Sequence, residues 1–465
     1  MRYTIERLAK GGEGIARVEG KTYFIAKTLP GESGEFRVIE EKKAFGRGVV
    51  VKCDRVSHFR VKDQCPVRTC SGCGFRHVSP EASLELKAKA VHENLCHQAH
   101  LDAEIPVTYW PVVQNDGTRR RIRIHKDRRG AGLFMAGTHK IVDIRRCLML
   151  PDALRRAVED VADHFVWKCD PVLDIQMDLD AEDRVYAAIK VNAEVVVDKG
   201  EKGGASQRRR TENRPFMGRY EHSLIEQYLC DAVERGIFAG AMYENRVWGA
   251  SSLRDVVCVD DREVVTWRRI GQFAQATQEA NEHLHRIVSS FLREIHPSTV
   301  LDLFCGAGNF TFRAAMEASE VTGIEFFGDR ETFSRGLEET RAKTPLGRVT
   351  LRLYDLDKGL PEGCPQADVV IADPARVGMT ADLCKALLAL SPSYILYISC
   401  EASCLGRDLQ KLMPSYCPVR FHYVDMFPRT ADVETVCVLQ KNEGAAKQAT
   451  HAEARSTAVL RPRTK

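Results

Sequence analysis

Residues 301–311 read LDLFCGAGNFT, and this stretch decides the fold class. It continues an apolar run from Thr299 to Phe304, which predicts a buried strand. Gly306 and Gly308 then form a tight turn, and a helix is expected from Phe310. A strand, a glycine turn and a helix in this order are typical of doubly wound α/β sheets, which bind cofactors at the carboxyl ends of their strands.

The sequence around this turn supports a parallel sheet. Further buried strands are expected at 320–324, 367–372 and 394–399, and helical patterns separate them. Glu325 ends the strand that follows the turn, at about the usual distance for an acid that binds ribose hydroxyls. The turn lacks both the third glycine of a dinucleotide site and the Lys-Ser/Thr of a phosphate loop, so neither a nicotinamide enzyme nor an NTPase is favoured.

Composition shifts along the chain predict four parts. Residues 1–58 contain short strand-like runs between glycines, with scattered Lys and Arg, and predict a small all-β barrel. Residues 59–266 mix strand and helix patterns and predict an α+β central domain, with a polar, basic loop at 199–219. Residues 267–441 form the α/β domain. Residues 442–465 are polar and Ala-rich, and predict a disordered tail.

The overall composition is that of a globular protein. The chain has 465 residues, 44% of them hydrophobic, and a formal net charge of only +4, so nucleic-acid binding must rest on local basic clusters. Neither a signal peptide nor an apolar run of the roughly 18–20 residues that span a bilayer is visible. We therefore expect a cytoplasmic, monomeric protein without a membrane partner. Its sixteen cysteines then favour metal-binding or catalytic roles over disulfides.

The stretch at 301–311 resembles the cofactor motif of the RNA uracil-5-methyltransferases, and the resemblance covers most of the chain. It implies a Rossmann-like methyltransferase domain that uses S-adenosylmethionine, preceded by a TRAM domain, an OB-like RNA-binding barrel, at 1–58. Thr277 stands where the family has Asn. The resemblance also implies six cofactor-binding residues: Gln275, Phe304, Asn309, Glu325, Asp355 and Asp373.

The catalytic residues follow from the same resemblance. Cys400 lies just beyond an apolar strand and matches the family's nucleophile, although Glu401 and Ala402 replace the usual Asn-Pro. A thiolate that adds to C6 of uracil makes C5 nucleophilic toward the sulfonium methyl group, and a base must then remove the C5 proton. Glu434 matches that base. Arg376, in a stretch that looks like the family's Asp-Pro-Pro/Ala-Arg-x-Gly, is a candidate cation to favour the thiolate.

Three cysteines lie close together at Cys65, Cys70 and Cys73. Three thiolates require a fourth ligand for zinc or for an iron–sulfur cubane, and spacing alone leaves both open. By family resemblance Cys147 is the fourth ligand, and the cofactor is a [4Fe-4S] cluster.

We therefore expect methylation of C5 of a uridine in RNA, with 23S ribosomal RNA as the substrate, because the barrel and the cysteine cluster both precede the catalytic domain. One alternative is a transfer-RNA enzyme of the same family. A cytosine-C5 methyltransferase is disfavoured, since such enzymes carry Pro-Cys and this chain has the reverse order at 364–365 and 417–418. Another alternative is a catalytically silent Fe–S protein that binds RNA.

Overall fold

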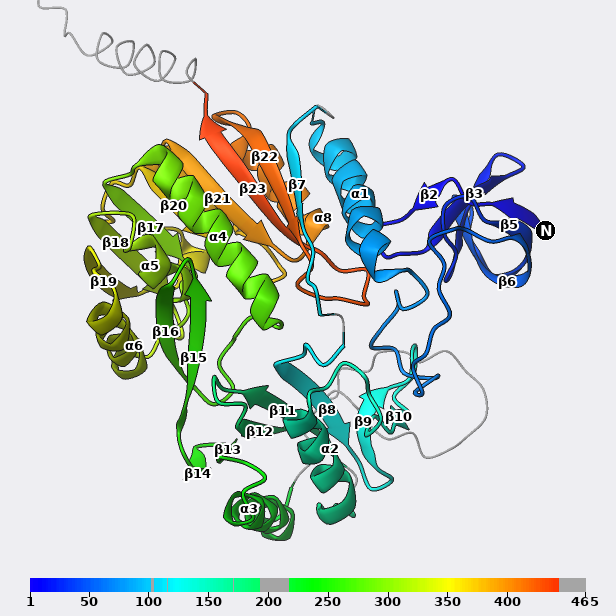
Figure 1. Ribbon diagram of the computed structural model, residues 1–465, viewed down its shortest axis with the longest axis horizontal. Coiled ribbons are helices and arrows are strands. Elements are labelled where there is room, and N and C mark those ends of the chain that lie inside the picture. Colours follow the sequence, from blue (N-terminus) through cyan, green and yellow to red (C-terminus); the bar gives the residue numbers. More distant parts are fainter. Residues whose placement is uncertain (102–103, 115, 170, 193–216, 443–465) are drawn as a thin grey trace, which may run out of the picture.

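The computed structural model describes residues 1–101, 104–114, 116–169, 171–192 and 217–442. Three bodies are visible in Figure 1: a small N-terminal barrel, a central domain and a larger catalytic domain. The expected tail at 442–465 lies outside the described residues except for Asn442, and so does most of the expected loop at 199–219. Among the described helices, none has the length and apolar character that crossing a membrane requires.

The N-terminal residues form a closed barrel. The strand order is β1-β5-β6-β4-β3-β2, and only Ile5 and Glu6 separate β1 at one end of this sheet from β2 at the other, so the sheet closes on itself. Aromatic and β-branched side chains such as Tyr23, Ile25 and Phe36 fill its core. The predicted barrel is confirmed. Its strands are β1 (Arg2–Thr4), β2 (Arg7–Leu8), β3 (Gly14–Val18), β4 (Lys21–Ile25), β5 (Ser33–Glu41) and β6 (Phe45–Arg55).

The catalytic domain is built on an eight-stranded sheet in the order β19-β18-β17-β20-β21-β23-β22-β7. The first five strands are parallel, and β23 runs antiparallel between β21 and β22. The predicted doubly wound α/β fold is confirmed. The strands are β7 (Val107–Trp110), β17 (Thr299–Leu303), β18 (Glu320–Glu325), β19 (Arg348–Leu353), β20 (Val369–Ala372), β21 (Tyr394–Ser399), β22 (Tyr416–Val424) and β23 (Glu434–Lys441).

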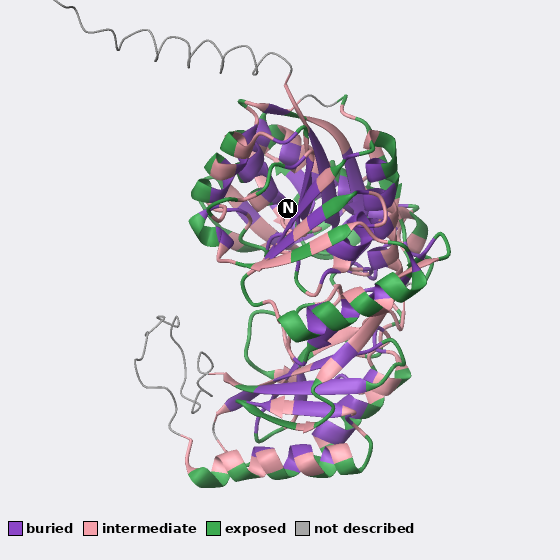
Figure 2. Cartoon of the chain, turned by 90° about the vertical axis from the view of Figure 1, so that its left-hand side faces the viewer, coloured by how far each residue is buried: buried purple, intermediate pink, exposed green. Residues whose placement is uncertain are grey.

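Helices cover both faces of this sheet and bury its apolar strands between two clusters of hydrophobic side chains. In Figure 2 the strands of this body are largely buried, whereas the helices expose one side. Such a sheet leaves only its carboxyl edge open to a cofactor. The helices are α4 (Gln278–Ile295), α5 (Asn309–Ala314), α6 (Arg330–Lys343), η1 (Leu356–Lys358), α7 (Ala381–Leu390) and α8 (Ala402–Leu412).

The central domain has a seven-stranded sheet in the order β10-β9-β8-β11-β12-β13-β14. A hairpin, β15–β16, then leads into the catalytic domain, and the Trp267 indole donates a hydrogen bond to Glu339 of α6 at 2.9 Å. The elements are β8 (Arg121–Lys126), β9 (Ala131–Phe134), β10 (Ile141–Val142), α2 (Asp152–His164), β11 (Val172–Leu179), β12 (Val185–Asn192), α3 (Arg219–Glu234), β13 (Gly240–Tyr243), β14 (Arg246–Gly249), β15 (Ser252–Val259) and β16 (Arg262–Arg269).

Helix α1 (Pro80–Ala99) and strand β7 precede the central sheet in sequence but pack on the catalytic domain. Helix α1 contacts both α8 and strand β2 of the barrel, so it joins these two bodies. Its Lys87 is almost fully buried and donates to Asp425 at 2.6 Å, Phe427 O at 3.1 Å and Thr430 O at 3.2 Å. A buried ammonium group must be satisfied in this way, so Lys87 fixes the segment that leads to β23.

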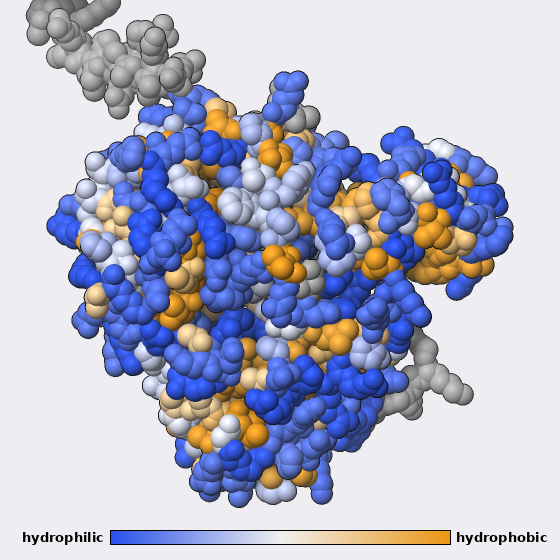
Figure 3. Space-filling model, viewed as in Figure 1, coloured by the Kyte–Doolittle hydropathy of each residue, from blue (hydrophilic) through white to orange (hydrophobic). Residues whose placement is uncertain are grey.

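The surface is mixed in character. The face shown in Figure 3 is mostly hydrophilic, with apolar side chains visible on the barrel at the right. The exposed apolar residues of the barrel and of the segment after it include Ile39, Val51 and Val56. Isolated apolar side chains on a surface are common and require no partner.

Candidate active site

The cofactor turn follows β17 in a constrained backbone conformation. Phe304 has a φ of 61°, and Gly306 and Gly308 have φ values of 55° and 96°. A Cβ at Gly308 would lie 2.6 Å from the Phe312 ring, so both the backbone angle and the packing require glycine there. This turn directs the start of α5 toward the carboxyl edge of the sheet.

The side chain of Asn309 is held by α4. Asn309 and Asn281 exchange amide hydrogen bonds at 3.0 and 3.2 Å, and His285 Nε2 lies 2.9 Å from Asn309 Oδ1. Burial lowers the pKa of His285 to about 3, with Arg313 adding to the effect, so the ring is neutral. Sequence reasoning missed Asn281 and His285. Their i, i+4 spacing on one helix was the available signal.

The carboxylate of Glu325 is engaged with the backbone. It accepts hydrogen bonds from the N–H groups of Gly306 at 3.0 Å, Phe326 at 2.8 Å and Phe327 at 2.9 Å. It therefore fixes the glycine turn against the end of β18. Asp355 caps η1 by accepting from Asp357 N at 3.1 Å, two residues beyond the end of β19.

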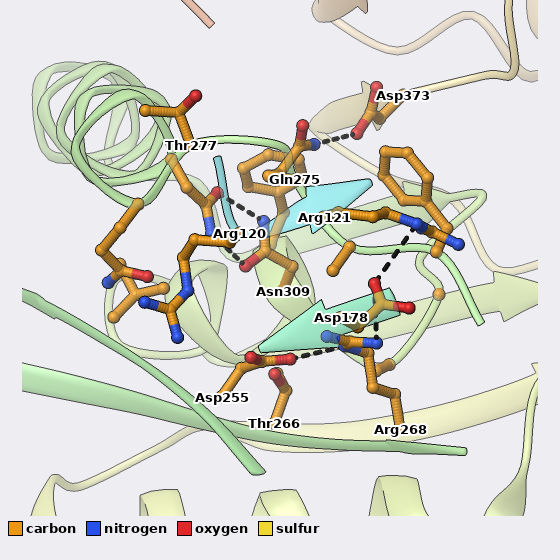
Figure 4. A pocket seen from close by; sticks show the side chains of 18 of the residues that line it. Arg120, Arg121, Asp178, Asp255, Thr266, Arg268, Gln275, Thr277, Asn309 and Asp373 are labelled. Carbon is orange, nitrogen blue, oxygen red and sulfur yellow. Dashed lines mark hydrogen bonds and ion pairs between the residues drawn. The ribbon is translucent and has the colours of Figure 1, made fainter. Parts of the chain in front are cut away.

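A cavity of ≈ 80 Å³ opens beside the turn. Its lining includes four of the six predicted cofactor residues: Gln275, Phe304, Asn309 and Asp373. Figure 4 shows the Gln275 amide pointing at Asp373, to which it donates at 3.1 Å. Glu325 and Asp355 are outside this lining, at the ends of the two strands beyond β17. The structure thus brings four predicted residues together and places the other two along the same edge.

Cys400 directly follows β21 and is half-buried. Burial raises the pKa of its thiol to about 12, and the charges of Glu434 and Asp373 add to this rise. Arg376 opposes it through its charge and a hydrogen bond to the thiolate. This placement supports the interpretation of Arg376 as the cation that favours the thiolate.

Glu434 is the first residue of β23 and is 4% exposed. Burial raises the pKa of its carboxyl group well above the usual value, Asp373 adds to the rise, and Arg376 opposes it. The carboxylate of Asp432 lies 3.8 Å from the Arg376 guanidinium group. A buried carboxylate of raised pKa is a stronger base than one in water, as proton abstraction requires.

Asp408, on α8, has a structural role beside the nucleophile. It is fully buried and accepts hydrogen bonds from Met379 N at 2.7 Å and the Tyr397 hydroxyl at 2.9 Å. A Cβ at Gly378 would lie 2.4 Å from its Oδ2 atom. Asp408 therefore ties the loop of Asp373 and Arg376 to the strand that presents Cys400.

The cysteine cluster surrounds a second cavity. All four predicted ligands line a space of ≈ 280 Å³: Cys65, Cys70, Cys73 and Cys147. Their thiols are free, and Gly72 N–H donates to Cys70 Sγ at 3.3 Å. Arg76 and Arg119 also line this cavity. Within the part of the chain that the structure describes, no three His, Cys, Asp or Glu side chains are grouped to hold a metal ion.

The fold and the site together define a methyltransferase of the S-adenosylmethionine-dependent class, with a cysteine and a carboxylate beside the cofactor turn. Residues 330–442 match the family described as tRNA (Uracil-5-)-methyltransferase, and residues 1–51 match the TRAM domain. The chain thus carries a region similar to the RNA uracil-5-methyltransferases at 330–442 and a region similar to TRAM domains at 1–51.

Relatives match over nearly the whole chain. The 23S rRNA (uracil(1939)-C(5))-methyltransferase RlmD of Chromohalobacter salexigens is 29% identical, covering 94% of this chain and 89% of the relative. An uncharacterized RNA methyltransferase of Listeria monocytogenes is 25% identical, covering 94% and 97%. The structure of Pyrococcus abyssi tRNA (uracil-54, C5)-methyltransferase with S-adenosyl-L-homocysteine has the same fold, with a TM-score of 0.64, 23% identity, and coverage of 94% and 99%.

The two raised pKa values predict how activity depends on pH. Cys400 must lose its proton to attack, and Glu434 must be ionised to accept one, so the single-turnover rate should rise with pH between 6 and 9. Arg376→Met removes the cation that lowers both pKa values, and should slow the reaction about tenfold throughout this range, because pH 6 to 9 lies well below the pKa of the Cys400 thiol. The rate of Arg376→Lys should lie between the rates of wild type and Arg376→Met. A rate for Arg376→Met equal to that of wild type at pH 7.5 would contradict the proposed role of Arg376.

Proposed function

We propose that this protein methylates C5 of a specific uridine in 23S ribosomal RNA. The observation that carries the proposal is the placement of Cys400 and Glu434 at the paired ends of β21 and β23, with Asp373 at the end of the neighbouring strand β20 and in the cavity beside the cofactor turn. One nucleophile and one buried carboxyl group beside a methyl-donor site are what substitution at a pyrimidine C5 requires.

S-adenosylmethionine, when bound along the turn and the ends of β17 to β19, supplies an electrophilic methyl group. The Cys400 thiolate adds to C6 of the uracil, and C5 then forms a bond to that methyl group as the bond from the methyl carbon to the sulfonium sulfur breaks, which leaves S-adenosylhomocysteine. Glu434 then accepts the C5 proton, the C5–C6 double bond re-forms, and the C6–S bond breaks to release the thiolate. Gln275 donates a hydrogen bond to Asp373, and both side chains line the cavity beside the cofactor turn. The target uridine must leave its base stack, because C6 is attacked from above the ring.

The RNA substrate is the next part of the proposal. Several relatives at 27–29% identity are named as 23S rRNA methyltransferases, which favours ribosomal RNA. The name of the matched family and the similar Pyrococcus abyssi enzyme keep transfer RNA as the second candidate. A ribosomal substrate implies a cytoplasmic site of action, and we expect a monomer.

The test uses purified protein, labelled S-adenosylmethionine, and unmodified transcripts of 23S rRNA and tRNA. The expected result is label in 5-methyluridine after nuclease digestion of the rRNA alone. Label in tRNA alone would show that transfer RNA, rather than 23S rRNA, is the substrate. With cofactor and RNA binding intact, absence of label in both would favour the silent RNA-binding protein.

We propose further that Cys65, Cys70, Cys73 and Cys147 hold a [4Fe-4S] cluster. Four free thiols around one cavity fit the ligand set of such a cluster. Arg76 and Arg119 would balance the negative charge of four thiolates, and the N–H of Gly72 already points at Cys70 Sγ.

The iron and sulfide content of anaerobically purified protein tests this proposal. We expect about four iron and four sulfide per chain, with visible absorbance that bleaches on reduction. Cys70→Ser should lose most of the iron, while Cys417→Ser, an exposed cysteine on β22, should keep it. Stoichiometric zinc without sulfide in the native protein would contradict the proposal.

A further inference from the structure

The N-terminal barrel reaches the loop that carries the nucleophile. Lys10 lies in the turn between β2 and β3, where Gly12 N donates to Ala9 O at 2.8 Å and Ala9 N donates to Glu13 O at 2.8 Å. From this turn the Lys10 ammonium group forms an ion pair with Glu401 and donates to Ser403 Oγ at 2.8 Å. Glu401 is the residue next to Cys400.

Packing contacts, in addition to the ion pair of Lys10, hold the barrel turn against the catalytic domain. A Cβ at Gly12 would lie 2.9 Å from Ala431 Cβ, three residues before Glu434. Leu8 and Leu29 of the barrel share a buried cluster with Phe75 and with Ala90 of α1. The position of Lys10 relative to the catalytic loop is therefore fixed by close packing.

Glu401 also organises the loop locally. It is the N-cap of α8 and accepts from Ser403 N at 3.1 Å, while its own N–H donates to Ser399 Oγ at 3.1 Å. Gln98 of α1 donates to Ser403 O at 2.8 Å. Burial raises the pKa of Glu401, but the hydrogen bonds from Lys10 and Ser403 outweigh this and leave it below its usual value, so the carboxyl group is ionised.

We propose that Lys10 and Glu401 are positioning residues through which the N-terminal barrel holds the Cys400 loop in its reactive conformation. Where the family has Asn-Pro after the cysteine, this chain has Glu-Ala and lacks the restraint of a proline ring. The ion pair supplies a restraint in its place, from a different domain. A domain that binds RNA would then also order the nucleophile.

The ion pair between Lys10 and Glu401 is expected to affect the order of the loop much more than the stability of the whole fold. Both side chains are about one-third exposed, at 32% and 29%, and such pairs contribute little to the stability of the fold. A loop that is held by a few contacts can still lose its order when one contact is removed. We therefore expect a change in the loop and in the rate, with an almost unchanged melting temperature.

The inference rests on the proposed methyl transfer, so the test has one readout that does not depend on it. Lys10→Met, Lys10→Arg and Glu401→Gln are compared with wild type, and Lys21→Met is the matched control, because Lys21 pairs with Glu41 inside the barrel. Glu401→Gln keeps the capping oxygen and loses the charge. The first readout is hydrogen exchange of the peptide covering 400–405, measured without RNA. The second readout is the single-turnover rate, measured at saturating RNA and cofactor.

Lys10→Met and Glu401→Gln should each speed exchange at 400–405 and slow the single-turnover rate about tenfold. The double variant should be no slower than either single one, Lys10→Arg should restore both readouts, and Lys21→Met should change neither. Unchanged exchange, or faster exchange with an unchanged rate, would overturn the proposal. So would a rise in KM for RNA alone, which would make Lys10 an RNA contact. If wild type transfers no methyl group, the proposed function fails, while the exchange result still decides whether Lys10 orders the loop.

Discussion

Cys400→Ala is expected to lower methyl transfer by about 10⁴-fold or more, because alanine has no nucleophilic group to add to C6 of the uracil. The fold should persist, since the side chain is small and only half-buried. The measurement is the single-turnover rate with saturating RNA and labelled S-adenosylmethionine, together with the cofactor affinity, which should remain within about threefold of wild type.

Cys404→Ala is the matched control. Cys404 lies in the first turn of α8, four residues after Cys400, and is half-buried like Cys400. Its replacement should leave the rate within a few-fold of wild type. Rapid methylation by Cys400→Ala would show that the reaction does not proceed through this thiol.

Glu434→Gln is expected to separate the two halves of the reaction. The thiolate can still add to C6 and methyl transfer can still occur, but glutamine cannot accept the C5 proton, so methylated RNA should remain attached to the protein. Turnover should fall by about 10²–10⁴-fold. A denaturing gel with labelled cofactor would show the label in a protein–RNA band, whereas wild type would release it into free RNA.

The control for this variant is Glu294→Gln, at the far end of α4, where the carboxylate is 54% exposed and pairs with Arg420. It should behave as wild type. If Glu434→Gln turned over at the wild-type rate, another group would have to remove the proton, and Asp373 would be the next candidate because it lies in the same cluster of charges.

The local part of this site could be predicted from the sequence. A residue at the end of a buried strand lies at the carboxyl edge of a parallel sheet, so the positions of Phe304, Glu325, Asp373 and Cys400 follow from the strand pattern alone. The barrel also follows from short strands between glycines. These predictions depend only on neighbours within about ten residues.

The contacts that join distant segments could not be predicted in this way. Lys87 and Lys10 look like surface lysines in sequence, yet one is buried against Asp425 and the other pairs with Glu401. The four residues of β7 carry no signal that they add an edge strand to the catalytic sheet. The raised pKa of Glu434 also depends on burial in the folded chain rather than on its neighbours in sequence.

The most direct test of the central claim uses RNA that contains 5-fluorouridine, with S-adenosylmethionine present. Fluorine at C5 cannot be removed as a proton, so the protein should remain covalently bound to its RNA. We expect a denaturant-resistant adduct on 23S rRNA. Mass spectrometry should show that the 5-fluorouridine is covalently bonded to Cys400. An adduct on another residue, or none on ribosomal or transfer RNA while both still bind, would contradict uracil-C5 methylation through Cys400.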